Sequence, residues 1–367
     1  MSFLDTNVKR GITVALGAAA VTYLLSRLCQ TNASGHAGPL SPIDASDPLC
    51  YALVFAKPHA HLNGGDQRVV QFIKASLSAA GLTIVATGTS SGPDIARDGT
   101  IDKHYRAIAA YALYTDPASL PINDKVKADF LAKYGVSWAN ATSSKRVLKC
   151  DDAANRLNLS PEEFIAVVDA ARPTGMRLGP GCYVSQLTDS SKGDTFWVVN
   201  GFYTGMRSEY VRPSARVTWF VVSWPERKLS WKSFRADVLG ATDPNRANPS
   251  SVRRQILIRS PELGLPFSPS TGNNCVHGSA SGLEALNERM IWTPRRQPEN
   301  DPFGQWLLGP QVGLTRDEVD WCLTNPLVTP PGEPGGAAQK PLFDLVEDAT
   351  YAEMAAALRQ VVRERRG

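Results

Sequence analysis

The chain has 367 residues, of which 43% are hydrophobic and 20% charged, an ordinary balance for a globular protein that buries a core. Its formal net charge of +4 is too small and too scattered to indicate a nucleic-acid partner, and we expect none. The length exceeds that of a typical single domain, so we expect a core domain with additions. The six cysteines form no C-x-x-C pair and are expected to be reduced thiols.

The N-terminus carries an uncharged apolar run over residues 11–25. Extended to residue 28, the run is at the short edge of what spans a bilayer. We favour an apolar helix that forms a single-pass membrane anchor at residues 11–28; a cleaved signal or organelle presequence and a buried core helix are the alternatives. Residues 1–32 are therefore assigned to an anchor or targeting segment, with a mitochondrial membrane favoured over another internal membrane. Residues 33–48, which are small, polar and rich in Gly and Pro, are assigned to a linker.

The folded part opens with alternating strands and helices. Apolar runs predict strands at 51–56 and 82–86, and helical spacing predicts helices over 66–80 and 101–113. Gly81 stands where the first of these helices would end.

Residues 111–194 have the character of an inserted block. Helices are expected at 123–134 and 151–158, and Ser160 is a suitable N-cap for another. We expect a small helical insertion that ends in a short hairpin near Gly181.

The core is expected to resume at residue 195. Residues 216–224 are strongly apolar and predict a central strand. A helix is expected over 281–292 with Ser281 as its cap. Residues 294–367 form a C-terminal extension with a terminal helix over 342–366.

His277 is the most informative single residue. It is followed by Gly278 and Ser279 and lies just before a predicted helix, a setting that core packing explains poorly. Glu288 lies within that helix, where a carboxylate could orient one ring nitrogen of His277 and leave the other as a nucleophile. On these residues alone, a structural or surface histidine is the alternative.

Phosphoryl transfer requires cations and hydrogen-bond donors around the moving group. The sequence offers Lys57 directly after the first strand, Arg235, Arg253, and the Thr242 hydroxyl. It contains no G-x-x-x-x-G-K-[ST] motif and no H-R-D or D-F-G set, which excludes a P-loop enzyme and a protein kinase.

Several short motifs in order resemble the nucleoside diphosphate kinase family over residues 49–110 and 195–293. The matching segments are Ala56-Lys57-Pro58 (V-K-P in the family), His104-Tyr105 (H-Y), Asn200 to Met206 (R-P-F-F-x-G-L), Leu239 to Pro244 (L-G-x-T-N-P), Pro249 to Arg253 (P-G-T-I-R) and Asn274 to Ser281 (N-x-x-H-G-S-D-S). Glu288 and Trp292 follow at the family's spacing. The resemblance does not extend to the anchor, the insertion or the C-terminal extension.

The resemblance implies an α/β fold of the α+β kind, in which helices cover a ferredoxin-like, four-stranded antiparallel sheet. It implies that His277 carries the phosphoryl group, with Glu288 and Ser279 in the catalytic set and Phe202 stacked on the base. The residues that it implies for nucleotide binding are Lys57, Tyr105, Phe202, Met206, Arg235, Thr242, Arg253 and Asn274.

The implied activity is that of a nucleoside diphosphate kinase, which transfers the γ-phosphoryl of a nucleoside triphosphate to a nucleoside diphosphate through a phosphohistidine. Mg²⁺ would be carried by the nucleotide, so no dedicated protein metal site is expected. The expected partners are nucleoside di- and triphosphates, the membrane, and further subunits of an oligomer or membrane complex.

The sequence departs from the family pattern at four site positions. The departures are His59 for the Asp after K-P, Asn200 for the Arg before the base-stacking Phe, Ala236 for a phosphate-binding Arg, and Ala280 for the Asp of H-G-S-D-S. Arg235, one position before Ala236, would reach the phosphate if its strand bulges. These departures support an alternative function, that of a catalytically weak or inactive kinase-like domain acting as a structural subunit of a membrane complex, such as a mitochondrial one. A nucleotide-binding sensor without turnover is a third interpretation.

Overall fold

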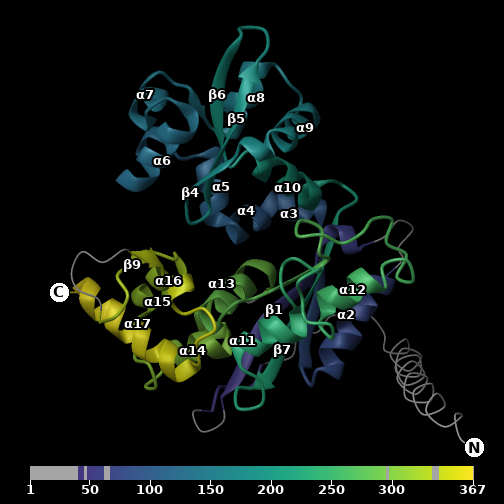
Figure 1. Cartoon of the computed structure of the whole chain (residues 1–367). Helices are drawn as coiled ribbons and strands as arrows, with labels where there is room; N and C mark the ends of the chain where they lie inside the picture. The colour runs from purple at the N-terminus through teal and green to yellow at the C-terminus, as the bar shows by residue number, and fades with distance from the viewer. Residues whose placement is uncertain (1–39, 45–47, 62–66, 295–296, 333–338, 367) are drawn as a thin grey trace, which may run out of the picture. The chain divides into compact units, whose positions relative to one another are not determined.

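A computed structural model of the chain describes residues 40–44, 48–61, 67–294, 297–332 and 339–366 (Figure 1). The predicted anchor at residues 11–28 lies outside these ranges. Within them, no helix combines the length and the apolar character that crossing a membrane requires. The chain forms two compact units, one of Met1–Thr89 with Val217–Gly367 and the other of Ser90–Arg216.

The first unit is built on a four-stranded sheet in the order β2-β7-β1-β8. Its strands are β1 (Leu49–Ala56), β2 (Thr83–Ser91), β7 (Arg216–Pro225) and β8 (Val276–Gly278). The prediction of an inner position for the apolar segment 216–224 is confirmed, because β7 lies between β2 and β1 and pairs antiparallel with β1. β1 pairs antiparallel with β8 on its other side. In chain order the four strands are therefore arranged 2-3-1-4.

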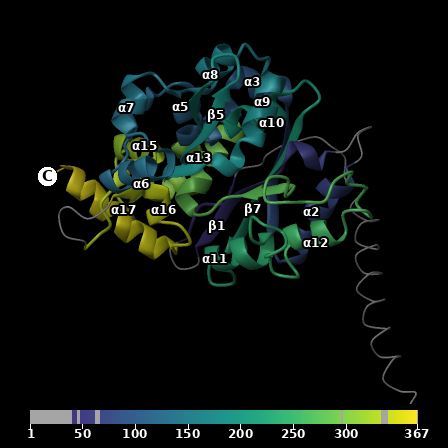
Figure 2. The ribbon, with the colours of Figure 1, turned by 45° about the horizontal axis from the view of Figure 1, so that its top comes forward.

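Two predicted helices pack on β1: α2 (Arg68–Ala79) and α13 (Gly282–Trp292). α2 buries an apolar stripe at helical spacing, and the chain leaves it through Gly81 at φ +83°, a conformation that glycine adopts without strain. α13 begins at Ser281, whose hydroxyl accepts a hydrogen bond from the Glu284 amide at 3.2 Å. A further helix, α12 (Val252–Ile258), lies beside α2 (Figures 1 and 2).

The segment after β7 is helical and ends at a tight turn. α11 (Trp231–Ser233) leads into η5 (Phe234–Leu239), which has π-helical hydrogen bonding. Gly240 then takes φ +89°, and a Cβ placed there would lie 2.3 Å from the Ser251 hydroxyl oxygen. Only glycine fits this position.

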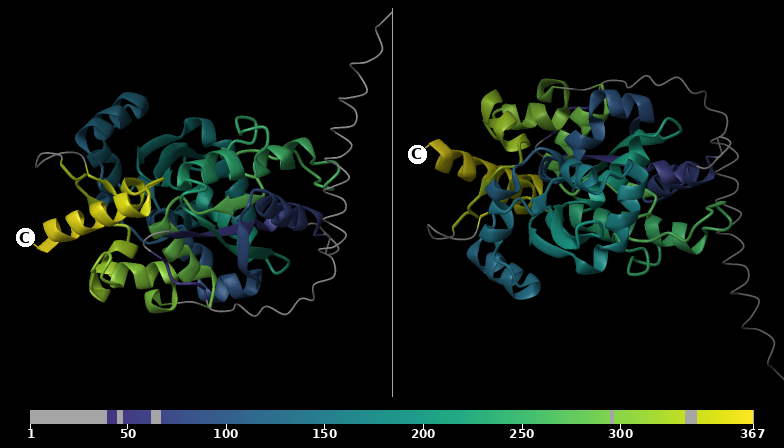
Figure 3. Two further views of the ribbon diagram at one scale, coloured as in Figure 1. Left: turned by 90° about the horizontal axis from the view of Figure 1, so that it is seen from below. Right: turned by 90° about the horizontal axis from the view of Figure 1, so that it is seen from above.

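The C-terminal extension packs onto α13 of the first unit. It contains α14 (Pro302–Leu308), α15 (Arg316–Leu323), α16 (Leu342–Leu345), α17 (Tyr351–Arg366) and a small sheet of β9 (Leu327–Val328) and β10 (Lys340–Pro341). The prediction of one continuous terminal helix is wrong. Asp348 takes φ +61°, and Thr350 and Glu353 exchange capping hydrogen bonds that start α17 afresh. Figure 3 follows α17 (yellow) to the C-terminus from two further sides.

The second unit contains a sheet of its own, in the order β3-β6-β5-β4. Its strands are β3 (Val147–Leu148), β4 (Met176–Gly179), β5 (Cys182–Asp189) and β6 (Asp194–Val199). The insertion was expected to be helical with one short hairpin at its end, and the structure has a four-stranded sheet there instead. The predicted hairpin near Gly181 is the β4–β5 turn, and the segment read as the resumption of the core strand is β6, an inner strand of this second sheet.

The second unit also contains helices. They include α3 (Gly92–Asp98), α4 (Thr100–His104), α5 (Arg106–Leu113), α6 (Asp124–Tyr134), α7 (Trp138–Ser143), α8 (Cys150–Leu157), α9 (Pro161–Ala170) and α10 (Phe202–Val211). Ser160 caps α9 as predicted, in a reciprocal capping box with Glu163. The single helix expected over 101–113 is two helices, because the helical conformation is interrupted at Tyr105.

Candidate functional site

The position of His277 is set by the pairing of β8 with β1. His277 lies opposite Phe55 in the strand register, and the two rings stack with centroids 4.5 Å apart and planes 22° apart. Phe55 also contacts Trp292 of α13, at 4.9 Å between ring centroids. Sequence inspection missed Phe55, because its relation to His277 is visible only once the register of β1 and β8 is known.

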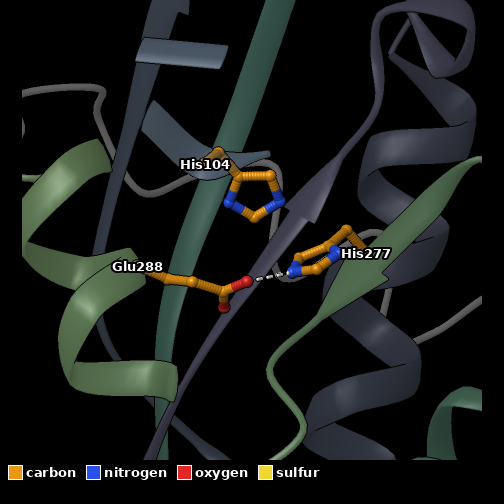
Figure 4. Close-up of side chains that lie close together, drawn as sticks. All are labelled: His104, His277 and Glu288. Carbon is orange, nitrogen blue, oxygen red and sulfur yellow. Dashed lines mark hydrogen bonds and ion pairs between the residues drawn. The ribbon is translucent and has the colours of Figure 1, made fainter. Parts of the chain in front are cut away.

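Glu288 holds the His277 ring from α13 (Figure 4). Its Oε1 atom lies 2.6 Å from His277 Nε2, and its Oε2 atom accepts a hydrogen bond from the Ser279 hydroxyl at 2.5 Å. The Ser279 oxygen in turn accepts from the Leu53 amide of β1 at 3.0 Å. The Glu288 side chain is 4% exposed and that of His277 17%. A buried carboxylate on Nε2 favours the tautomer with its proton there, which leaves the lone pair on Nδ1.

Lys57 lies next to the His277 motif because the hydrogen bonding between β1 and β8 extends one residue past the end of β1. The Lys57 amide donates to the Cys275 carbonyl at 2.9 Å, which extends the β1–β8 pairing. Burial, followed by the charge of Arg253, lowers the pKa of Lys57 to about 8. Two cations that repel one another in a desolvated setting favour the binding of an anion.

Arg253 and Asn274 tie the turn after η5 to the start of β8. The Arg253 guanidinium donates to the Val276 carbonyl at 3.0 Å and to the Gly240 carbonyl at 2.5 Å. The Asn274 amide nitrogen donates to the Thr242 carbonyl at 3.0 Å. The structure thus brings these predicted nucleotide-binding residues together beside the backbone that carries His277.

Arg235 is placed differently from its sequence-based expectation. It lies in the π-helical turn η5, so no strand is present to bulge, and that part of the expectation is wrong. Its guanidinium forms ion pairs with Glu347 and with Asp348, the latter at 2.8 Å between Nη1 and Oδ1. The Asp348 amide donates to the carbonyl of Ala280, the position that departs from the family's Asp. Phosphate binding by Arg235 stays a prediction.

Cys275 and His59 have structural roles in this unit. Burial raises the pKa of the Cys275 thiol to about 12, so the thiol is neutral at physiological pH and unsuited to nucleophilic attack. His59 Nε2 accepts a hydrogen bond from the Cys275 amide at 2.9 Å. The described cysteines are free thiols, as predicted.

The remaining predicted nucleotide-binding residues belong to the second unit. Tyr105 lies between α4 and α5, Phe202 begins α10, and Met206 follows Phe202 by about one turn and packs on the unit's core. The ring of Tyr183, from β5, lies beside Phe202 with centroids 5.9 Å apart. No sequence pattern singled out Tyr183.

Comparison with known proteins finds likeness at the level of structure. No family model matches the chain, and no curated protein sequence matches it. Similar solved structures include a nucleoside diphosphate kinase from Encephalitozoon cuniculi, with 14% identity over 66% of this chain and 88% of that chain and a TM-score of 0.31. A nucleoside diphosphate kinase from Pyrobaculum aerophilum has 19% identity over 68% of this chain and 98% of that chain, with a TM-score of 0.32. The enzyme from Borrelia burgdorferi, solved with vanadate and ADP, has 17% identity over 68% and 89% of the two chains and a TM-score of 0.30.

Proposed function

We propose that this chain is a nucleoside diphosphate kinase that carries the γ-phosphoryl group on His277. The observation that carries the proposal is the hydrogen bond from His277 Nε2 to the buried Glu288 carboxylate, which directs the lone pair to Nδ1. The 2-3-1-4 strand arrangement of the first unit is the order of a ferredoxin-like sheet, in agreement with the fold that the sequence motifs imply.

The first step is the binding of a nucleoside triphosphate with its Mg²⁺, which arrives as part of the substrate. Lys57 and Arg253 lie next to the backbone of the His277 motif, and their positive charge spreads the charge of the phosphates. Thr242 and Asn274 supply further polar groups, and the Asn274 side chain donates to the Thr242 carbonyl. Phe202 is the stacking partner of the base that the family resemblance implies.

The chemical step is an in-line displacement at the γ-phosphorus. A bond forms between His277 Nδ1 and phosphorus while the bond to the β,γ-bridging oxygen breaks, and the nucleoside diphosphate leaves with that oxygen. Glu288 holds Nε2–H and stabilises the ring as it gains positive charge, and Ser279 holds the second oxygen of Glu288. A nucleoside diphosphate then attacks the phosphohistidine in the reverse sense.

The test is incubation of the full chain with γ-labelled ATP and Mg²⁺. We expect an acid-labile, base-stable label on the wild type, loss of the label in His277→Ala, and transfer of the label to added GDP. His36→Ala, in the predicted linker, is the matched histidine control and should label normally. A wild type that binds nucleotide but acquires no label would contradict the enzyme and favour a sensor or structural subunit.

A further inference from the structure

Tyr183 is a large aromatic residue that the core of the second unit does not use. Its neighbours in β5, Cys182 and Val184, are buried in the core cluster, whereas Tyr183 is 38% exposed. Successive side chains of a strand point to opposite faces, so the Tyr183 ring lies on the other side of the strand from that core. An exposed tyrosine in a strand is common by itself. Tyr183 differs in that hydrogen bonds with a buried residue fix its position.

A single buried amide fixes Tyr183 beside the start of α10. The side-chain oxygen of Asn200 accepts a hydrogen bond from the backbone amide of Tyr183 at 2.8 Å. The backbone amide of Asn200 donates to the Tyr183 carbonyl at 2.9 Å. Its side-chain nitrogen donates to the carbonyls of Gly181 at 2.8 Å and Ile108 at 3.1 Å. Asn200 is 1% exposed and takes φ +46°, a conformation that asparagine tolerates better than most residues. Because these groups are buried and satisfied, the hairpin is held in one place.

The consequence is a defined pair of aromatic rings. Phe202 follows Asn200 by two residues, and its ring and that of Tyr183 form an edge-to-face pair with an interplanar angle of 77°. Such pairs are favourable in themselves and restrict the motion of both rings. The pair places the Tyr183 ring next to Phe202, so a planar ligand lying on Phe202 would also lie near Tyr183.

We infer that Tyr183, contributed by the inserted hairpin, is a second aromatic contact for the nucleobase and that Asn200 positions it. This inference rests on the proposed function, in which Phe202 stacks on the base. The residue that departs from the family pattern, Asn200, thus anchors the insertion to the base-binding surface. Tyr183 would recognise the base and leave the phosphates untouched.

The experiment measures the dissociation constants of Mg·ADP and Mg·pyrophosphate for the full chain by isothermal titration calorimetry. Pyrophosphate carries the phosphates without a base. We expect Tyr183→Ala to weaken ADP binding about threefold to tenfold and to leave pyrophosphate binding unchanged, while Tyr183→Phe stays near the wild type. Tyr114→Ala is the matched control, since Tyr114 is a 73% exposed tyrosine of the same unit. Phe202→Ala is measured alongside, with a larger loss of ADP binding expected.

The results separate this inference from the function on which it rests. If Phe202→Ala weakens ADP selectively and Tyr183→Ala does not, or if Tyr183→Ala binds ADP more tightly, the role of Tyr183 is overturned and the base site stands. If neither Tyr183→Ala nor Phe202→Ala weakens the binding of ADP more than that of pyrophosphate, the assignment of the base to Phe202 is wrong. The inference about Tyr183 is then overturned as well. Equal weakening of both ligands by Tyr183→Ala also overturns the inference, because a general structural defect would produce it.

Discussion

The surroundings of His277 and of Phe202 use buried polar groups in different ways. Around His277, the first unit buries ionisable groups: Glu288 against the imidazole and, one residue further along α13, Arg289 in an ion pair with Asp301. Before Phe202, the second unit buries a neutral amide, Asn200. Burying a charge costs free energy unless its partners are well placed. Removing one partner is therefore strongly destabilising. In the proposed function, the first environment serves chemistry and the second serves positioning.

The largest effect is expected at Glu288. Glu288→Gln keeps the size of the side chain but removes the negative charge that, in the proposed mechanism, stabilises the ring as it accepts the phosphoryl group. We expect the rate of phosphohistidine formation at saturating Mg·ATP to fall by about 10²- to 10⁴-fold. Glu364→Gln, on the exposed end of α17, makes the same chemical change elsewhere and should label at the wild-type rate. A Glu288→Gln variant that labels as fast as the wild type would show that the buried charge is not used in the chemistry.

The next effect concerns stability at the ion pair of Arg289 and Asp301. Both side chains are fully buried, and Asp301 Oδ2 lies 2.7 Å from Arg289 Nε. Asp301→Asn leaves the guanidinium without its counter-charge, so the free energy of unfolding should fall by about 3–5 kcal/mol in urea titrations. Glu299→Gln removes a carboxylate from the exposed pair with Arg316 and should leave the urea midpoint unchanged.

A smaller loss of stability is expected at Asn200. Asn200→Ala removes side-chain hydrogen bonds to three backbone groups, all of them uncharged, and should lower the free energy of unfolding by about 1–3 kcal/mol. The urea titrations that measure Asp301→Asn supply the direct comparison. A cost at Asn200 that exceeds the cost at Asp301 would break the contrast between the two environments.

The smallest effect is a pH dependence that arises from Lys57. Its pKa in the folded chain, about 8, lies below the ordinary lysine value of 10.5, so the ammonium charge is lost as pH rises through about 8. A rise in pH therefore has opposite effects on the stability of the unliganded protein and on nucleotide binding. The unliganded protein gains stability between about pH 8 and 10.5, because the unfolded chain there binds more protons. Binding of Mg·ADP weakens several-fold between about pH 7.5 and 9.5. Lys57→Met should remove the pH dependence of binding, and a variant that keeps it would assign the titration to another group.

Short sequence patterns predicted the elements whose formation depends on residues that are close together in the chain. The inner strand β7 follows from an apolar run, and the start of α13 follows from the capping residue Ser281. What the sequence did not predict depends on contacts between distant segments. Phe55 stacks on His277 only because β1 pairs with β8, and β6 was misread because its partner strand β5 belongs to the second sheet. Asn200 was recognised as a departure from a family pattern, but its bonds to the hairpin require the fold.

The central claim is that Glu288 reserves Nε2 of His277 and thereby directs the phosphoryl group to Nδ1. The most direct measurement is the position of the phosphoryl group, read by ³¹P NMR and by mass spectrometry of the chain after brief exposure to Mg·ATP. We predict a phosphoramidate at Nδ1 of His277. A group found on Nε2, or on any other residue, would contradict the account.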